Sequence, residues 1–196
     1  MKVGLLFGSF NPVHLGHLAV VRYWLNETDL DQVWLMVSPH NPHKRLADLA
    51  PAEDRLHMVE LATQGDSYVH PSAVEFQLPR PSYTIQTLVH LRQAYPHHAF
   101  VLLLGADAAA SLPTWKEGDR ILREWPLWVY PRKGASEENL PASPQLRFFP
   151  EAPRIDLSAT QIRKYLRESR SIRYWVPLAV EAYIYARGLY GTRPPA

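Results

Sequence analysis

The sequence has no cysteine, no long apolar run and almost no net charge, and each absence excludes something. Without cysteine among its 196 residues, the chain can form neither disulfides nor thiolate metal sites. No apolar run reaches the roughly 20 residues that a membrane-spanning helix needs. The 21 Lys and Arg nearly balance the 19 Asp and Glu, which does not favour a nucleic-acid-binding protein. We therefore expect a soluble, cytoplasmic protein without nucleic-acid or membrane partners.

What the sequence does contain is a regular alternation of apolar and amphipathic segments. Strands are expected at residues 3–7, 32–38, 67–76, 98–105, 126–131 and 146–149. Helices are expected at residues 15–27, 52–64, 81–95, 119–125, 157–169 and 176–191. This order predicts an α/β fold, a Rossmann-like doubly wound parallel sheet with flanking helices and a C-terminal helical segment. Residues 1–190 are expected to form a single domain, and residues 191–196 a flexible tail.

The stretch GSFNPVHLGH, residues 8–17, lies between the first expected strand and the first helix. Gly8 allows a sharp turn, Ser9 and the following amides offer hydrogen-bond donors, and the start of a helix favours an anion. His14 and His17 are three residues apart, so they share a face of one helical turn and can both donate to phosphate oxygens. The stretch therefore indicates an anion site, although an ordinary turn or part of a zinc site remains an alternative.

A second candidate anion site is LSATQIR, residues 157–163. Ser158 and Thr160 lie where a helix should begin, and Arg163 follows about one turn later, within reach of the same anion. Taken alone, this stretch is better explained as an ordinary helix cap with a solvent-facing arginine.

Together, these stretches resemble the (T/H)xGH and ISxTxIR signatures of the nucleotidyltransferase superfamily. PHNPHK, PSYTIQTL and GADAAASLPTW, which lie between them in the expected order, resemble the bacterial nicotinate-nucleotide adenylyltransferases. The resemblance runs from about residue 3 to residue 190. It implies that ATP and nicotinate mononucleotide are joined by direct in-line attack, without a covalent enzyme intermediate, to give deamido-NAD and pyrophosphate. It also implies Mg²⁺ carried by the ATP phosphates, with no protein metal site, and leaves a homo-oligomer open.

The resemblance assigns the phosphate-binding roles residue by residue. Gly8, Ser9 and Phe10 would form a backbone cradle between the two substrates. His14 and His17 would act as catalytic donors to the α- and β-phosphates. Three residues near the second site, of which Arg163 is also assigned to catalysis, would hold the phosphates that leave: Ser158, Thr160 and Arg163. Lys44, in a proline-rich loop from Pro39 to Pro51 that is expected to be a mobile lid, would reach over the triphosphate.

The resemblance also assigns the mononucleotide side. Gly105 and Asp107 would line the nucleotide pocket, with Asp107 on a ribose hydroxyl. Trp115 would stack on the pyridine ring, Thr84 would face the ring substituent, and Arg132 is a further candidate. Without the resemblance, Trp115 reads as a loop-packing residue, Thr84 as a helix cap and Lys44 as a solvated charge.

Asn11 is a departure from the resemblance, because many bacterial members have Asp at this position. An Asn-Pro pair also occurs in eukaryotic-type enzymes that favour the amide substrate, so nicotinamide mononucleotide is the alternative substrate. A non-catalytic nucleotide sensor on the same fold is the alternative from a different functional class.

Overall fold

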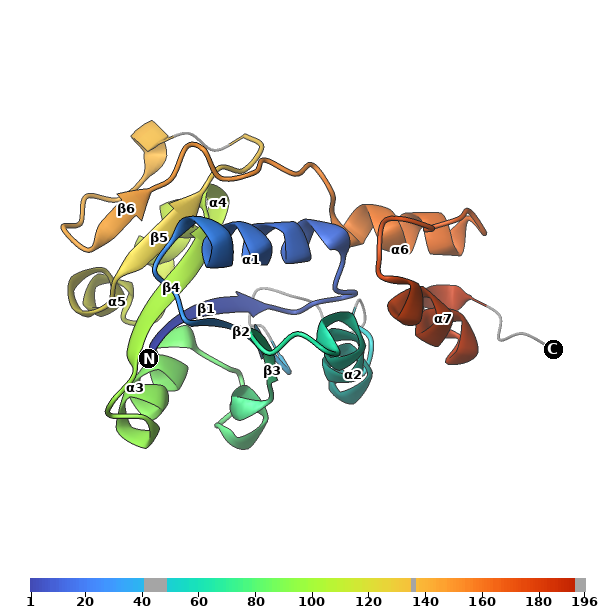
Figure 1. Cartoon of the computed structure of the whole chain (residues 1–196), viewed down its shortest axis with the longest axis horizontal. Coiled ribbons are helices and arrows are strands. Elements are labelled where there is room, and N and C mark those ends of the chain that lie inside the picture. Colours follow the sequence, from blue (N-terminus) through green and yellow to red (C-terminus); the bar gives the residue numbers. More distant parts are fainter. Residues whose placement is uncertain (41–48, 135–136, 193–196) are drawn as a thin grey trace.

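Six parallel strands form one sheet at the centre of the protein (Figure 1). The computed structural model describes residues 1–40, 49–134 and 137–192. The strands are β1 (Lys2–Gly8), β2 (Gln32–Val37), β3 (Val69–Ser72), β4 (Ala99–Gly105), β5 (Leu127–Tyr130) and β6 (Leu146–Phe148). Their spatial order is β3-β2-β1-β4-β5-β6. The predicted Rossmann-like parallel sheet is therefore confirmed.

Helices cover both faces of this sheet, as the nearly continuous apolar character of the strands requires. They are α1 (Leu15–Glu27), α2 (Ala52–Thr63), α3 (Thr84–Ala94), α4 (Ala106–Ser111), α5 (Gly118–Glu124), α6 (Ala159–Arg167) and α7 (Leu178–Ala186). Alternate residues of a strand point to opposite faces. Leu6 accordingly packs in the core under α1, α2, α6 and α7, and its neighbour Leu5 in the core under α3, α4 and α5.

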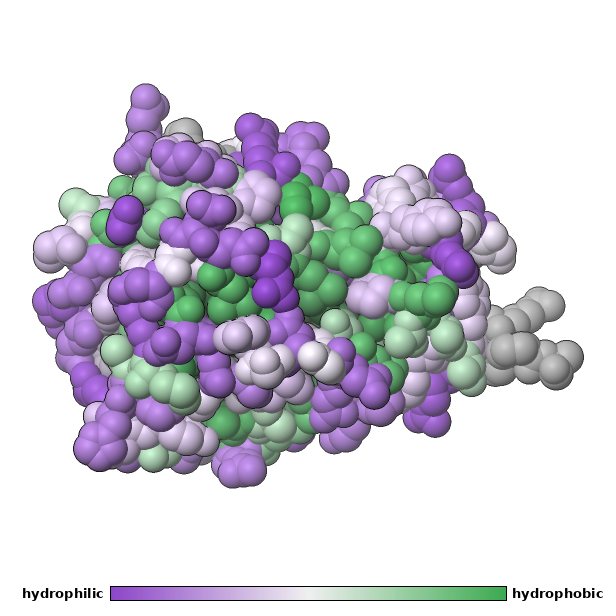
Figure 2. All heavy atoms as spheres, in the orientation of Figure 1, coloured by the Kyte–Doolittle hydropathy of each residue, from purple (hydrophilic) through white to green (hydrophobic). Residues whose placement is uncertain are grey.

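The outer surface separates hydrophilic from apolar side chains. In the view of Figure 2, hydrophilic side chains cover most of the periphery, and apolar ones gather in the middle of the face, around α1. None of the helices in the described part of the chain is long and apolar enough to cross a membrane.

The order of the strands fixes where a ligand can bind. The chain winds outward from β1 through β2 to β3, then returns to pair β4 with the other edge of β1. The neighbouring strands β1 and β4 end at Gly8 and Gly105. In sheets of this kind, ligands bind beyond the carboxyl ends of the strands, where the winding direction reverses.

Several expected boundaries differ from the structure. The strand expected over residues 67–76 ends at Ser72, and the chain turns into a 3-10 helix over Val74–Gln77. That turn places Glu75 inside the protein, where an extended strand would not put it. The helix expected from residue 157 begins at Ala159, with Ser158 as its cap, and the last helix ends at Ala186.

The last helix, α7, is attached to the domain through α2. Asp54 on α2 is buried, and its carboxylate accepts a hydrogen bond of 2.7 Å from the Tyr183 hydroxyl on α7. The Arg187 guanidinium lies 3.3 Å from the same oxygen. In Figure 1, α6 and α7 lie together at the end of the molecule that carries the C-terminus.

Candidate active site

A cavity of about 650 Å³ opens where β1 and β4 end, within the size range of small-molecule sites. Apart from Lys44, which lies outside the described residues, every site residue expected from the sequence lines it: Gly8, Ser9, Phe10, His14, His17, Thr84, Gly105, Asp107, Trp115, Arg132, Ser158, Thr160 and Arg163. The fold therefore brings together segments that lie up to 155 residues apart in the sequence, from position 8 to position 163.

The loop after β1 owes its shape to the packing of Phe10. This residue has φ of +44°, which is unusual for a residue with a side chain, and its ring is buried. A Cβ atom at Gly8 would lie only 3.0 Å from that ring. The ring also meets His17 edge-on, with 5.1 Å between the centroids. Gly8 therefore makes room for the Phe10 ring.

Gly16 lies between the two histidines, where a missing side chain could make room for a ligand. In the structure, a Cβ atom at Gly16 would lie 3.0 Å from the His14 ring and 3.4 Å from Ile155. Gly16 is therefore needed for the packing of His14 inside the protein.

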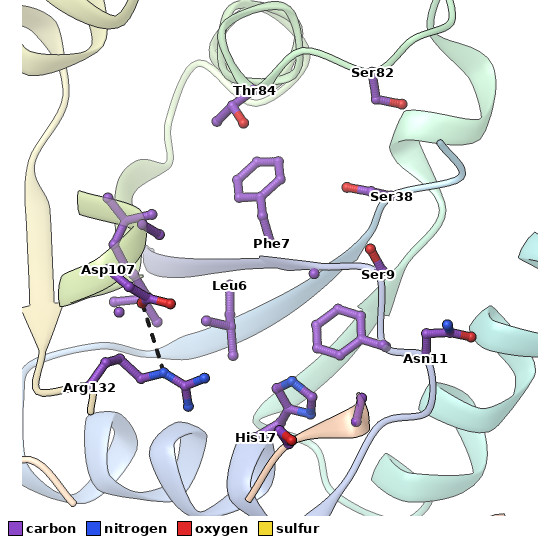
Figure 3. A pocket seen from close by; sticks show the side chains of 18 of the residues that line it. Leu6, Phe7, Ser9, Asn11, His17, Ser38, Ser82, Thr84, Asp107 and Arg132 are labelled. Atoms are coloured by element: carbon purple, nitrogen blue, oxygen red, sulfur yellow. Dashed lines mark ion pairs between the residues drawn. The ribbon is translucent and has the colours of Figure 1, made fainter. Parts of the chain in front are cut away.

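The two histidines are buried as a stacked pair. The ring centroids of His14 and His17 are 3.7 Å apart and the planes are inclined by 24°. The backbone N–H of His14 donates to Nδ1 of His17 at 3.2 Å, so the neutral His17 ring carries its proton on Nε2. Figure 3 shows the His17 ring pointing into the cavity, where that N–H can donate to a ligand.

Burial keeps both rings uncharged near neutral pH. It lowers the pKa of His14 to about 4, and the nearby Arg132 guanidinium acts in the same direction. The pKa of His17 is also held well below its usual range, first by burial and then by His14 and Arg132. Each histidine therefore acts as a neutral hydrogen-bond donor and not as a cation.

The second candidate anion site, which we call the second phosphate cradle, lies at the start of α6. The Ser158 hydroxyl accepts a hydrogen bond of 3.2 Å from the Gln161 N–H, which is the geometry of a helix cap. Arg163 reaches across to the first cradle, where its Nη1 donates to the carbonyl oxygen of Asn11 at 2.9 Å. Its Nη2 lies 3.4 Å from the Thr160 hydroxyl. One guanidinium thus joins the two cradles into a single site.

Arg55 is a positioning residue that we did not predict from the sequence. It lies on α2 and is only 1% exposed. Its guanidinium donates hydrogen bonds of 2.7–2.9 Å to the carbonyl oxygens of Ser9, Ser38, Pro39 and Ala50. It therefore fastens the loops after β1 and β2 to the start of α2, and it satisfies carbonyl groups that burial would otherwise leave without partners.

Asn11 is part of the same fastening. Its side chain is buried, and Oδ1 accepts a hydrogen bond of 3.0 Å from the backbone N–H of Ala50. In Figure 3, Asn11 lies at the opposite side of the cavity from Asp107 and well away from Thr84. The Asn11 side chain thus serves an internal contact.

The ends of β4 and β5 contribute a pair of opposite charges. Arg132 Nε lies 3.8 Å from the Asp107 carboxylate, as the dashed line in Figure 3 marks. A Cβ atom at Gly105 would lie 2.6 Å from Asp107 and 2.7 Å from Arg132. The glycine therefore allows the two side chains to meet above the end of β4.

The opposite end of the cavity is aromatic. Trp115 is half-buried, and its Nε1–H donates to the Ser111 hydroxyl at 2.9 Å, which fixes the plane of the indole. Thr84 is the first residue of α3, whereas Tyr83 occupies the cap position, so the reading of Thr84 as a helix cap is wrong. Phe7, which we did not single out, stands between Thr84 and β1 in Figure 3.

A buried carboxyl group lies beneath this end. Glu75 is 1% exposed, and its Oε1 accepts a hydrogen bond of 2.8 Å from the Thr87 hydroxyl. Burial raises its pKa, while the hydroxyls of Ser38, Thr87 and Ser82 act in the opposite direction. Nothing in the sequence around Glu75 indicated that it would be buried.

Across residues 1–40, 49–134 and 137–192, no group of three or more His, Asp or Glu side chains is arranged to hold a metal ion.

Comparison with known proteins agrees with this geometry. The cytidylyltransferase-like family matches residues 5–165. A probable nicotinate-nucleotide adenylyltransferase of Cytophaga hutchinsonii is 42% identical over 190 residues, covering 97% of this chain and 98% of that protein. One from Thermus thermophilus is 41% identical, covering 97% and 100%. The chain belongs to the nicotinate-nucleotide adenylyltransferase family.

Solved structures show the same fold in members of this family at low sequence identity. A Plasmodium falciparum nicotinic acid mononucleotide adenylyltransferase complexed with NaAD superposes with a TM-score of 0.81 at 18% identity, over 96% of this chain and 97% of that one. The sequence resemblance from which the expected residue roles were taken therefore reflects membership in a family of enzymes, the nicotinate-nucleotide adenylyltransferases.

Proposed function

We propose that this adenylyltransferase joins ATP and nicotinate mononucleotide to give deamido-NAD and pyrophosphate. A phosphate oxygen of the mononucleotide attacks the α-phosphorus of ATP in line, and the bond from that phosphorus to the bridging β-oxygen breaks. The leaving group is pyrophosphate, and Mg²⁺ carried by the ATP phosphates would neutralise part of its charge. No enzyme nucleophile takes part, so the protein contributes positioning and charge stabilisation.

The observation that carries this proposal is the junction of the two cradles through Arg163. A dinucleotide-forming reaction needs the α-phosphorus between two bound substrates, with donors on the oxygens that gain charge. The Nε2–H of His17 and the loop after β1 meet that need from one side. Ser158, Thr160 and Arg163 support the phosphates that leave from the other side.

The remaining cavity suits a pyridine mononucleotide. The fixed indole of Trp115 offers a stacking surface, and Phe7 and Tyr83 line the same end. Asp107 offers an acceptor for a ribose hydroxyl, and its pairing with Arg132 keeps that end of the cavity close to neutral. Lys44 over the triphosphate remains a prediction from the sequence, because it lies outside the described residues.

The proposal is tested by incubating the pure protein with ATP, Mg²⁺ and nicotinate mononucleotide. We expect equal amounts of pyrophosphate and deamido-NAD, measured by a coupled phosphate assay and by chromatography. A parallel reaction with nicotinamide mononucleotide is expected to be slower. Faster turnover of the amide would replace the proposed substrate, and ATP binding without any product would indicate a nucleotide sensor.

A further inference from the structure

The structure bears on a question that the motifs leave open, namely what distinguishes an acidic from an amide ring substituent. The inference rests on the proposed function. Three cations line the described part of the cavity: Lys116, Arg132 and Arg163. Arg163 is engaged with the Asn11 carbonyl, and Arg132 with the Asp107 carboxylate. Lys116 is the cation that remains for the pyridine end.

Lys116 lies directly beside the aromatic groups of that end. It follows Trp115 in the chain, and its Nζ stands 4.4 Å from the centroid of the Tyr83 ring. The negative face of that ring attracts the ammonium group and keeps it near the start of α3. Within the described residues, Lys116 forms neither a hydrogen bond nor an ion pair, so its charge is not compensated by a carboxylate of the protein.

Two further features of the start of α3 favour a negative group there. The cap position, Tyr83, makes no side-chain cap hydrogen bond, so the first amides of this 11-residue helix are not satisfied by a cap. The Ser82 hydroxyl lines the cavity and is buried, and its one interaction within the described part of the chain is with the Glu75 carboxyl. A carboxylate at this place would meet an ammonium group, the start of a helix and a hydroxyl.

The acidic side chains of the same cavity do not cancel this preference. Asp107 is paired with Arg132. Glu75 lies below Ser82, and burial raises its pKa, which shifts it toward the neutral form. Within the described residues, Lys116 is therefore the charge at this end of the cavity that no carboxylate lies close enough to neutralise.

We propose that Lys116 is a specificity residue that favours a mononucleotide with a carboxylate on its pyridine ring over one with a neutral amide. Its ammonium group attracts the carboxylate, whereas an amide of the same shape gains little from it. Because Lys116 is exposed at the mouth of the cavity, water and salt weaken the attraction. We expect a roughly five- to tenfold contribution to the preference, corresponding to an ion pair that is partly shielded from water.

The test compares two substrates on four proteins. Lys116→Met removes the charge and keeps an unbranched side chain, Lys116→Arg keeps the charge, and Lys133→Met is the matched control at an exposed lysine that does not line the cavity. The kcat/KM values for nicotinate and nicotinamide mononucleotide are measured for each variant and the unmodified protein. The measurements are repeated at low salt and at about 0.5 M salt, where exposed charges are screened.

We expect Lys116→Met to lower kcat/KM for the acid roughly five- to tenfold, mainly through KM, and to change the amide less than twofold. Lys116→Arg should restore most of the preference, and Lys133→Met should leave both substrates unchanged. High salt should reduce the preference of the unmodified protein but not that of Lys116→Met. An equal loss on both substrates, or an unchanged ratio in an active variant, overturns the inference alone. If the unmodified protein turns over neither substrate, the proposed function falls and the inference falls with it.

Discussion

The two phosphate cradles differ in how much of their geometry exists before a ligand arrives. The cradle after β1 is buried, with Phe10 2% and His14 4% exposed, and Arg55 fixes the loop from below. The cradle at the start of α6, a helix of nine residues, is more open, with Ser158 and Thr160 exposed and Arg163 half-buried. In the proposed reaction, charge develops at the first cradle, where donors fixed in advance contribute most to the rate. The second cradle would release pyrophosphate, which adaptable surface contacts allow.

The largest effect that this comparison predicts is at His17. His17→Ala should lower kcat by about 10²- to 10³-fold, because it removes a fixed donor from the charge-developing side. The dissociation constant of ATP, measured by calorimetry, should change much less. His97→Ala, at an exposed histidine away from the cavity, is the control. A kcat within twofold of the unmodified value would show that the buried cradle is not catalytic.

A smaller loss is expected at the exposed cradle. Arg163→Ala should lower kcat/KM for ATP by about 10- to 100-fold, since hydrogen bonds to charged groups contribute about 1.5–3 kcal/mol. Arg163→Lys should recover part of this loss, because an ammonium group keeps the charge without the planar fork. Arg167→Ala on the same helix serves as the control. If Arg167→Ala caused the same loss, the effect would come from the charge of the helix and not from the cradle.

The burial of the first cradle predicts a loss of stability in acid. The unfolded chain takes up protons at His14 near pH 6.5, whereas the folded protein resists protonation down to about pH 4. This part of the stability is therefore present at neutral pH and is lost as the pH falls from about 6.5 toward 4. Between pH 7 and pH 5, His14 alone should cost about 2 kcal/mol of the free energy of unfolding.

Urea unfolding at several pH values measures this loss. His14→Gln provides the comparison, because it removes the titrating group and should flatten the pH dependence by that amount. Parallel pH profiles of the two proteins would mean that His14 is accessible to protons in the folded state. In that case the two cradles would not differ in burial as described.

The smallest effects separate the two roles of Ser158. Ser158→Ala removes a helix cap and should lower stability by about 1 kcal/mol. Ser158→Asp keeps an acceptor for the Gln161 N–H, so the melting temperature should stay near that of the unmodified protein. Its negative charge should nevertheless repel the leaving phosphates and raise KM for ATP. An unchanged KM in Ser158→Asp would limit Ser158 to the structural role.

The sheet and both motifs could be predicted from the sequence because the signals are local. Near-continuous apolar segments such as Val3–Phe7 define buried strands, and glycine and cap residues at their ends define turns. The helix α4 was missed because Ala106–Ser111 is a short segment without a hydrophobic period. The early end of β3 was missed because the burial of Glu75 depends on Thr87, which lies on another helix.

The burial of Arg55 depends on contacts that cannot be predicted from the neighbouring sequence. Within the expected helix over residues 52–64, an arginine reads as a solvent-facing charge. It lies three and four residues before Met58 and Val59, both fully buried, and this spacing places it on the same inward face. This spacing could therefore have indicated from the sequence that Arg55 faces inward. The carbonyl groups that make its burial tolerable come from three separate segments, and only the folded chain brings them together.

The hydrogen bond from Arg163 to the Asn11 carbonyl spans 152 positions of sequence. Asn11 leaves the ribosome early and Arg163 late, so a growing chain that already contains the whole sheet still holds only half of the site. In the proposed reaction, turnover begins only after α6 has docked against the loop after β1. A bound nucleotide that touches both cradles would then stabilise the completed domain in preference to any partly synthesised one.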